Sequence, residues 1–342
     1  MEPAKRRRDI PVLLLHDIDP QWELHEQETA HQSAQILINE LQNEGHSVVD
    51  VPVTHHSLDK VLKSYNPNDY ILFNWCEGLP GVDHSEHTVA QILEDKQFVY
   101  TGSPSDILFL CWNKAAIKKL LQIQNIPTPD GIVASDTSAI GWDKFPAIVK
   151  PAFEHCSLGI TEDSVVFNRK ELLDRIDYIL ANFKQPAIVE DFIDGREFHV
   201  TLWGNGVIHA LPPAEMDFSA FDDIKDRVCT YNSKFKPGTS HYENITLKIP
   251  AQLDNAQLSI LNETALKAYR ALGCRDYARI DIRLKDGIFY ILDINPNPDF
   301  SPDTSTIYTA EHAGLSYGAF ASCLVNLAAL RHPVYGQHAV LS

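Results

Sequence analysis

Hydrophobic positions in the first hundred residues follow two different periods. Short apolar runs, typical of strands buried on both faces, cover residues 10–15, 48–53, 70–73 and 98–100. Stretches with a helical spacing of apolar positions cover residues 26–44, 58–64 and 86–95. Gly45 follows the first of these stretches, at a position where glycine commonly ends a helix. The alternation of strands and helices predicts a small parallel α/β domain.

The pattern changes beyond this domain. One helix is expected over residues 105–124, before the proline-rich segment 125–129. Further strands are expected at residues 147–150, 187–190 and 197–203, and further helices at 170–182, 253–272, 307–313 and 317–330. Residues 211–243 have no regular pattern, and a loop of this length is typical of a lid or a binding loop. The expected domains are an amino-terminal α/β domain at 1–104, a central subdomain with a linking helix at 105–200, and a carboxyl-terminal subdomain with the reactive site at 201–342.

Two apolar strands near the carboxyl end carry polar residues on one face. Arg279 and Asp281 alternate along the first strand, and Asp293 and Asn295 alternate along the second. Two facing strands would bring these four side chains together. Carboxylate and amide oxygens hold Mg²⁺, commonly with substrate phosphates as further ligands. The pattern therefore predicts a magnesium site for chemistry on a nucleotide triphosphate.

The turn between these strands decides which face each side chain occupies. A two-residue loop at Asp286-Gly287 would pair Asp281 with Leu292, whereas a loop one residue longer would pair Asp281 with Asp293. A slip of one residue moves every side chain of a strand to the other face. We therefore predict an odd-length turn that contains glycine.

The composition limits the possible classes of function. The 342 residues, 44% hydrophobic and 22% charged, are typical of a globular protein with two or three domains. No apolar run approaches the ~18 residues of a membrane helix, and the basic start is followed only by a short strand, so a signal peptide is not expected. The formal net charge of −17 argues against binding to nucleic acid or to an anionic membrane. We expect a cytoplasmic location, where six widely spaced cysteines without a Cys-x-x-Cys motif would be reduced thiols.

Two further segments are considered as binding sites, one for zinc and one for a dinucleotide, and neither is favoured. His84 and His87 lie three residues apart without a third ligand nearby in sequence, so capping or surface roles are favoured over a zinc site. The loop after the first strand, 16–21, lacks the Gly-x-Gly-x-x-Gly motif that binds a pyrophosphate. The first domain is therefore not expected to bind a dinucleotide.

Five segments follow one another in a fixed order through the last two-thirds of the chain: Phe145–Pro151, Ile188–Glu197, Ser233–Phe235, Tyr277–Asp281 and Asp293–Asn295. None is specific alone, but their order and spacing together resemble the ATP-grasp fold, and specifically the D-alanine–D-alanine ligase family. The amino-terminal domain resembles this family more weakly, through Phe73–Gly78 and Tyr100–Ser103. The resemblance implies an α/β fold in which two α+β subdomains grip ATP, preceded by a parallel-sheet domain.

The resemblance also implies a role for each matching residue. The residues that it implies for nucleotide binding are Lys114, Lys150, Glu190, Phe192, Ile193, Glu197 and Lys234. Among them, the lysines match phosphate contacts, the segment 190–193 matches the adenine edge, and Glu197 matches the ribose contact. Lys234 matches a lysine that is carried on a mobile loop over the triphosphate.

A second set of matching residues belongs to the metal and the reaction. Asp281, Asp293 and Asn295 match the metal ligands, and the implied catalytic residues are Arg279, Lys150 and Lys234. Arg279 matches the arginine that stabilises negative charge on the reacting acyl group. The family usually has glutamate where Asp293 stands, so we expect the bridging of two metal ions to be altered but not lost.

The departures from the family concern the substrate. Residues 16–22 lack the glutamate-containing, glycine-rich loop that holds the first D-alanine. Cys156 and Phe235 replace a serine and a tyrosine, and Asp299 replaces a glycine whose amide helps to bind the oxyanion. We interpret the thiol of Cys156 as steric rather than nucleophilic. The expected substrate residues are Arg279, Asp299, Thr304 and Ser305, and because several polar contacts are lost, we expect a substrate pair other than two D-alanines.

The implied reaction is ATP-dependent ligation of a carboxylate and an amine through an acyl phosphate, which yields ADP and phosphate. Thr304 and Ser305 favour an amino acid as the amine, whereas the carboxylate stays open among an amino acid, a peptide and a vinylogous acid. The expected cofactors are ATP and two Mg²⁺ ions, and the family suggests a homodimer. Two alternatives stay open, namely a kinase-like ATP-grasp enzyme that releases a phosphorylated product and a non-catalytic module that binds Mg-ATP.

Overall fold

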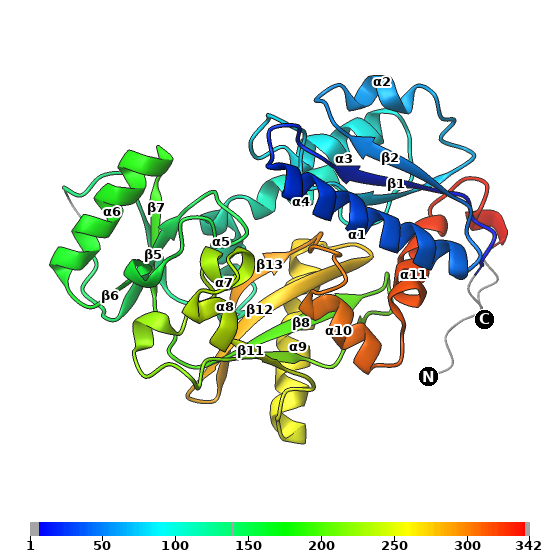
Figure 1. Cartoon of the computed structure of the whole chain (residues 1–342). Helices are drawn as coiled ribbons and strands as arrows, with labels where there is room; N and C mark the ends of the chain where they lie inside the picture. Colours follow the sequence, from blue (N-terminus) through cyan, green and yellow to red (C-terminus); the bar gives the residue numbers. More distant parts are fainter. Residues whose placement is uncertain (1–6, 139, 339–342) are drawn as a thin grey trace.

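The computed structural model describes residues 7–138 and 140–338, without the side chains of Phe235 and His338. The first six residues of the basic start and the replacement at Phe235 therefore lie outside what the structure describes. Three sheets organise the chain, and helices cover them (Figure 1). Among the described residues, no helix combines the length and the apolar character that crossing a membrane requires.

The amino-terminal part is a parallel three-stranded sheet between two layers of helices. The strand order is β2-β1-β3, and Tyr100 adds a parallel bridge to Leu72 at the β3 edge. Buried side chains of the central strand alternate between two cores, with Leu13 on one face and Leu14 on the other. The elements are β1 (Val12–Asp17), α1 (Leu24–Asn43), β2 (Val48–Val53), α2 (Leu58–Leu62), β3 (Ile71–Trp75) and α3 (Glu86–Asp95). This arrangement confirms the predicted parallel α/β domain.

The prediction of a single helix over residues 105–124 is wrong. Two helices occupy this stretch, α4 (Ser105–Cys111) and α5 (Lys114–Ile123). The break occurs because Asn113 caps the second helix, and its side-chain oxygen accepts a hydrogen bond of 3.0 Å from the backbone N–H of Ala116. As a result, Lys114 begins a helix instead of lying within one.

The central part has a four-stranded antiparallel sheet of its own, in the order β4-β7-β5-β6. Its elements are β4 (Gly131–Ala134), β5 (Ala147–Pro151), η1 (Glu162–Ser164), β6 (Val165–Val166), α6 (Arg169–Phe183) and β7 (Ala187–Asp191). Helix α6 covers one face, where buried side chains such as Val149, Ile176 and Val189 form a separate core. Figure 1 shows this unit at one end of the molecule.

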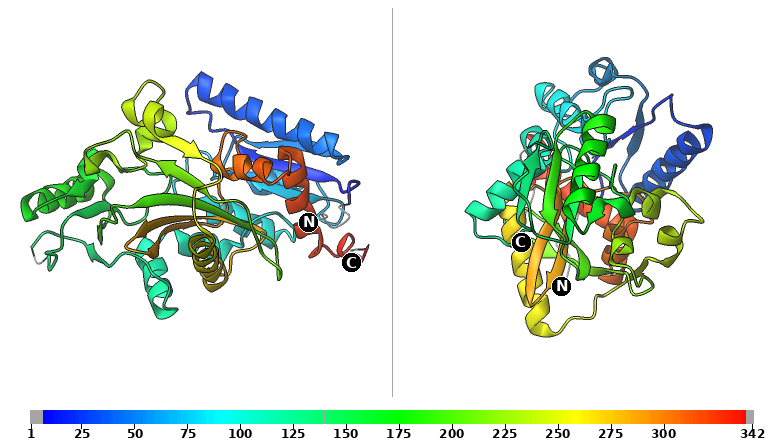
Figure 2. Two further views of the ribbon diagram at one scale, coloured as in Figure 1. Left: turned by 90° about the horizontal axis from the view of Figure 1, so that it is seen from below. Right: turned by 90° about the vertical axis from the view of Figure 1, so that its left-hand side faces the viewer.

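The carboxyl-terminal part is built on a six-stranded sheet in the order β11-β10-β8-β12-β13, with β9 beside β8. The elements are β8 (Arg196–Trp203), β9 (His209–Ala210), β10 (Ala214–Asp217), β11 (Thr246–Lys248), α9 (Asn255–Leu272), β12 (Tyr277–Lys285), β13 (Ile288–Asn295), α10 (Ser305–His312), α11 (Tyr317–Ala329) and η3 (Gly336–His338). Helix α9 packs on one face of the sheet, as the views of Figure 2 show. The expected boundary at residue 200 lies inside β8, and the domain limits stay a prediction.

A lid, which we define as residues 218–245, connects β10 to β11. It contains η2 (Ile224–Asp226), α7 (Tyr231–Phe235) and α8 (Ser240–Asn244). The expectation of irregular structure over residues 211–243 was therefore only partly right, because strand β10 and these short helices fall within that range. The lid rests on the central unit, where Arg227 lies 3.3 Å from Asp194 and the backbone N–H of Tyr231 donates to Ile160.

A β-bulge sets the register of β12 and β13. Their connection is the two-residue turn Asp286-Gly287, with positive φ at both residues, so the predicted odd-length turn is wrong. The pairing nevertheless places Asp281 opposite Asp293, because the register shifts by one residue at Leu292. Leu292, the extra residue in β13, thus brings Asp281 and Asp293 to the same face, which we had expected a longer turn to do.

Asp276 joins the amino-terminal and carboxyl-terminal parts. Its fully buried carboxylate accepts two hydrogen bonds, of 2.6 and 2.7 Å, from the guanidinium of Arg331. It also accepts hydrogen bonds from the backbone N–H of Gly102 at 3.0 Å and from the side-chain amide of Asn205 at 2.7 Å. One carboxylate thus connects the end of the first domain, the turn after β8 and the segment after α11.

Removal of this charge should destabilise the whole chain. We expect Asp276→Asn to lower the free energy of unfolding by about 3–5 kcal/mol, because it leaves Arg331 without its anionic partner. Urea denaturation followed by fluorescence measures this, with Asp95→Asn on the exposed end of α3 as a control that should change stability by less than about 0.5 kcal/mol. Equal stability of the two variants would contradict the role of Asp276.

Candidate active site

The four residues predicted to meet on β12 and β13 do so. The guanidinium of Arg279 donates two hydrogen bonds, of 2.7 and 3.0 Å, to the carboxylate of Asp281. The side-chain amide of Asn295 lies 3.2 Å from the same carboxylate. Although burial favours the neutral acid, Arg279 keeps the pKa of Asp281 well below its ordinary value. Asp281 is therefore an anion at neutral pH.

Asp293 completes this group from the bulged strand. Its carboxylate lies 3.4 Å from the ammonium of Lys114 at the start of α5. Burial opposes ionisation of Asp293, but Lys114 and neighbouring cations lower its pKa from the ordinary value. Two anionic carboxylates with an amide oxygen beside them form a hard-oxygen donor set, and such a set fits Mg²⁺.

Lys150 is not a free surface lysine but part of a buried triad. Its ammonium lies 2.8 Å from one carboxylate oxygen of Glu190, and the ammonium of Lys118 lies 3.1 Å from the other. Burial favours neutral Glu190, but the two lysines keep its pKa below the ordinary value. The side chain of Glu190 is therefore engaged by two cations, which leaves the triad with one net positive charge. That sign fits a position beside phosphates.

Lys118 was not among the predicted site residues. It is 7% exposed and donates hydrogen bonds to the hydroxyl of Thr128 and to the carbonyl of Pro129. Its only sequence signal is its position four residues after Lys114, which places both lysines on one face of α5. Its pairing with Glu190 depends on how α5 packs against β7, which no local pattern specifies.

Glu197 and the segment after β7 meet through a buried arginine. The carboxylate of Glu197 accepts a 2.7 Å hydrogen bond from Arg283, which also donates to the backbone carbonyl of Ile193 at 2.8 Å. The guanidinium of Arg283 lies 5.0 Å from the ring centre of Phe192. These contacts fix the segment predicted to lie at the adenine and ribose, although the nucleotide roles themselves stay predictions.

His199 is a second residue that sequence reasoning missed. It pairs with Asp281 across β8 and β12, and its ring nitrogens lie 3.8 Å from Asp281 and 2.9 Å from the hydroxyl of Ser305. Burial lowers the pKa of His199 to about 4, so its imidazole is neutral at neutral pH. The alternation of Glu197 and His199 on β8 was the available signal, but their facing strand was not known.

The lid and the loop after β5 face this group from the other side. Lys234 lies on the exposed side of α7. Cys156 is exposed in the loop after β5, and both Cys156 and Ser157 have positive φ, so this loop turns sharply beside the reactive group. Burial lowers the pKa of the neighbouring His155 to about 4. All six cysteines, Cys156 included, are free thiols.

The predicted substrate residues lie after β13, and their polar groups are already engaged. The carboxylate of Asp299 accepts hydrogen bonds from the indole N–H of Trp75 at 3.2 Å and from the hydroxyl of Ser301 at 2.8 Å. The hydroxyl of Thr304 donates to the backbone carbonyl of Ser301 at 2.9 Å. The carboxylate of Asp299 thus connects the loop after β13 to Trp75 at the end of β3.

Further carboxylates line the amino-terminal side of the same cleft. Asp17 accepts a 2.9 Å hydrogen bond from the backbone N–H of Glu77, which follows β3. Crowding by the surrounding protein, together with the charges of Asp299, Asp17 and Glu86, raises the pKa of Glu77, although this residue still reaches solvent. Burial raises the pKa of Glu86 to about 8, and Asp17 adds to the shift. Each of these groups raises the pKa of its neighbours, so a cationic group placed among them would favour their ionised forms.

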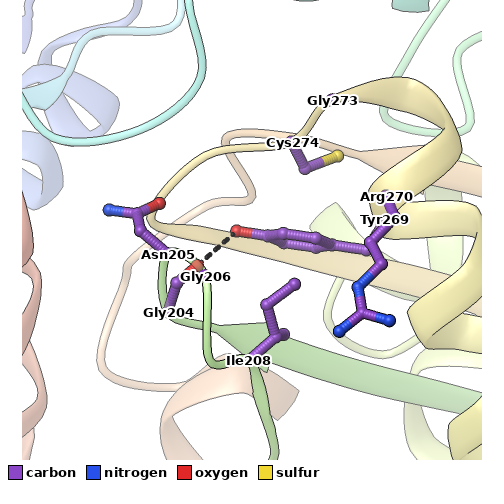
Figure 3. Close-up of a pocket in the computed structure, with 8 residues that line it drawn as sticks. All are labelled: Gly204, Asn205, Gly206, Ile208, Tyr269, Arg270, Gly273 and Cys274. Carbon is purple, nitrogen blue, oxygen red and sulfur yellow. Dashed lines mark hydrogen bonds between the residues drawn. The ribbon is translucent and has the colours of Figure 1, made fainter.

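The remaining candidates lie apart from this group. His84 packs against Trp112 and lies 3.3 Å from Glu154, whereas His87 packs against Phe109. A separate pocket lies between the turn after β8 and the end of α9, where Tyr269 donates to the carbonyl of Gly204 (Figure 3). None of the predicted site residues lines that pocket.

The sequence was then compared with known protein families. Residues 130–326 match the family model described as D-ala D-ala ligase C-terminus, which covers more than half of the chain. The chain belongs to the D-alanine–D-alanine ligase family. Membership makes it an ATP-dependent ligase that forms carbon–nitrogen bonds, as predicted, and ATP is its nucleotide.

Individual relatives agree with this assignment. A protein of Sinorhizobium fredii, described as uncharacterized protein y4sG, is 30% identical over 264 residues, which are 77% of this chain and 75% of that protein. D-alanine–D-alanine ligase A of Bacillus cereus is 27% identical over 282 residues, 80% and 85% of the two chains. The crystal structure of D-alanine–D-alanine ligase from Bacillus anthracis complexed with ATP has a TM-score of 0.72 at 20% identity, over 96% of this chain and 99% of that one. The predicted fold class is confirmed.

The raised pKa of Glu86 makes stability depend on pH. A carboxyl group whose pKa is higher in the folded state binds more protons there, so its contribution to stability falls as pH rises from the ordinary value of 4.5 to about 8. We expect Glu86→Gln to remove this fall, so the variant gains stability over the wild type by up to ~1.4 kcal/mol per pH unit in that window. Thermal unfolding at several pH values tests this, with the exposed Glu263→Gln as control. A difference that does not change with pH would contradict the assignment.

Proposed function

We propose that the chain joins a carboxylate to an amine through an acyl phosphate, and that its substrates are not two D-alanines. The observation that carries the proposal is a group of four residues. Hydrogen bonds of 2.7–3.2 Å join Arg279 and Asn295 to Asp281, and Asp293 lies opposite Asp281 and 3.4 Å from Lys114. This group unites hard-oxygen ligands, a phosphate-side cation and a fixed guanidinium at one place. Acyl phosphate chemistry needs all three.

Different residues would serve the two steps of the reaction, which are phosphorylation of the carboxylate and attack by the amine. Mg-ATP would supply the phosphoryl group that activates the carboxylate. Asp281, Asp293 and Asn295 would hold two Mg²⁺ ions, and Lys150 and Lys114 would orient the phosphates. Arg279 would stabilise the oxyanion that forms when the amine attacks, since its two hydrogen bonds to Asp281 already fix its plane.

In this proposal, separate residues contact the adenine, the ribose and the triphosphate of ATP. The backbone of Phe192 and Ile193, next to Glu190, would bind the adenine edge, and Glu197 would bind the ribose. Lys234 on the lid would cover the triphosphate and exclude water, which otherwise hydrolyses the acyl phosphate.

The substrate part of the proposal is supported by the cleft opposite Arg279. Asp299 places a carboxylate, which accepts hydrogen bonds from Trp75 and Ser301, where the family has glycine. The hydroxyls of Thr304 and Ser305 are bonded within the protein, to Ser301 and His199. A cationic group such as the ammonium of an amino acid would lower the raised pKa values of Glu77 and Glu86, and their ionised forms would then hold that group. A site that has exchanged this many polar groups should reject the original substrate strongly.

Other parts of the proposal rest on the sequence pattern and on the family. These are a homodimer, which light scattering would detect, a cytoplasmic location, and the division of the chain at residues 104 and 200. Isotopic exchange or calorimetry at fixed nucleotide concentration would count the Mg²⁺ ions.

The reaction is tested by phosphate release from ATP and Mg²⁺ with a panel of amines and carboxylates. We expect release only with a particular pair, coupled to a product that contains both, and a loss of about 10²-fold or more in Asp293→Ala. A stable phosphorylated product without any amine would instead identify a kinase-like enzyme. Binding of Mg-ATP without turnover on the whole panel would identify a nucleotide-binding module.

The lid lysine gives an independent test. We expect Lys234→Ala to lower kcat by about 10²-fold and to change ATP affinity much less, because the lid acts after the nucleotide is bound. Lys236→Ala, two residues further along the lid and also exposed, is the matched control and should keep wild-type kcat. Equal effects of the two variants would mean that charge on the lid, and not Lys234 itself, matters.

A further inference from the structure

Three residues away from the reactive group converge between the lid and the central unit. Glu162 belongs to η1, Asp226 ends η2 and His241 lies in α8. A ligand atom from each lies within 4.8 Å of the other two. Among the described residues, this is the only set of three such side chains that meets this distance. Glu162 belongs to the central unit, whereas Asp226 and His241 belong to the lid, so folding of the lid onto that unit brings them together.

The orientation of His241 is fixed by its neighbours. Its side chain is 7% exposed, and its ring stacks on Phe221 with 4.9 Å between centres and 16° between planes. The ring nitrogen Nε2 lies 3.0 Å from the backbone carbonyl oxygen of Asp226. A carbonyl oxygen only accepts hydrogen bonds, so Nε2 carries a proton. In a neutral imidazole, Nδ1 then has the lone pair.

That lone pair faces an oxygen. Nδ1 of His241 lies 3.2 Å from the carboxylate oxygen Oε1 of Glu162, which offers only lone pairs when ionised. Two lone pairs at this distance need a positive charge between them, either a second ring proton or a metal ion. Ligand bonds of ~2.0–2.2 Å to zinc, at the angles of a tetrahedral or octahedral site, place two ligand atoms roughly 3.0–3.5 Å apart. The observed separation lies in that range.

The charges around the group favour a divalent cation over a proton. The carboxylate of Glu162 lies beside Nδ1 and that of Asp226 lies 3.7 Å from Nε2, so two negative charges flank one imidazole, and a single proton would leave one of them without compensation. In the described part of the chain, the neighbouring cations pair elsewhere, Lys225 with Glu171 at 3.8 Å and Arg227 with Asp194 at 3.3 Å. The carbonyl on the other ring nitrogen is also the usual second partner of a metal-bound histidine.

We propose that Glu162, Asp226 and His241 form a binding site for a divalent transition-metal ion, such as Zn²⁺, that fastens the lid to the central unit. One imidazole nitrogen and two carboxylates are a donor set that zinc-like ions accept, and water would complete the coordination. The ion is separate from the magnesium ions of the reaction, which need only oxygen ligands. It acts on the reaction through the position of the lid, which carries Lys234.

Cobalt absorption tests the site directly, because Co²⁺ replaces Zn²⁺ and its visible bands report the ligands. Protein stripped of metal is titrated with Co²⁺ in excess Mg²⁺, which occupies the oxygen site of Asp281 and Asp293. We expect one saturable set of bands that Zn²⁺ abolishes. Trypsin cleavage within residues 218–245 should slow several-fold when Zn²⁺ is added. Neither readout requires catalysis, so failure of the metal site can be distinguished from failure of the proposed reaction.

Matched variants decide between the metal and the proton. His241→Gln and Glu162→Gln should lose the cobalt bands and the protection from trypsin, whereas Asp163→Asn, on the exposed neighbour of Glu162, should keep both. Glu162 is half-exposed and lies outside the lid, so its variant does not depend on lid folding. The proposal is overturned if the wild type shows no saturable cobalt signal in excess Mg²⁺, or if both variants keep it. Slow trypsin cleavage in wild type without metal, lost in both variants, would identify a protonated His241 bridge instead.

Discussion

The buried carboxylate of Asp276 holds the amino-terminal sheet on the carboxyl-terminal sheet. It bonds Arg331, Asn205 and the backbone of Gly102, which come from three distant parts of the chain. The apolar core around Phe300 spans the same junction, with residues from β1, β3, α10 and α11. The proximity of Glu77 and Asp299 depends on this junction, since one follows β3 of the first sheet and the other follows β13 of the last.

Much of the fold could be predicted from the sequence because its signals are local. Alternating apolar runs specified the parallel sheet, and Gly45 ended α1 where expected. The misses have physical causes. Asn113 caps a new helix inside a continuous helical pattern, and the bulge at Leu292 changes register without any glycine or proline to signal it. Asparagine is a strong capping residue, so the first break had a local signal that the helical periodicity masked, whereas the bulge had none.

In the candidate site, too, residues with a local sequence signal were predicted and residues without one were missed. Asp281, Asp293, Asn295 and Arg279 were predictable, because alternation on two consecutive strands fixes which side chains share a face. Their roles in metal binding and catalysis stay predictions. Lys118, His199 and Glu86 were not predicted, since each meets its partner through packing between elements distant in sequence. Each of these residues is recognised in the structure because its titratable side chain lies close to another one, and none of them belongs to a sequence motif.

The separate core of the central unit has a mechanical consequence. The chain enters this unit before β4 and leaves it after β7, and the unit keeps a core of its own, whereas the two outer sheets share one core. At the second connection, a side chain on Gly195 would meet the carbonyl oxygen of Leu284 at 2.0 Å, so the backbone there passes against β12 as a pivot. Opening of the cleft would then be a rotation of residues 130–191 as one rigid body. The wall that selects the substrate would stay assembled while the nucleotide enters and leaves.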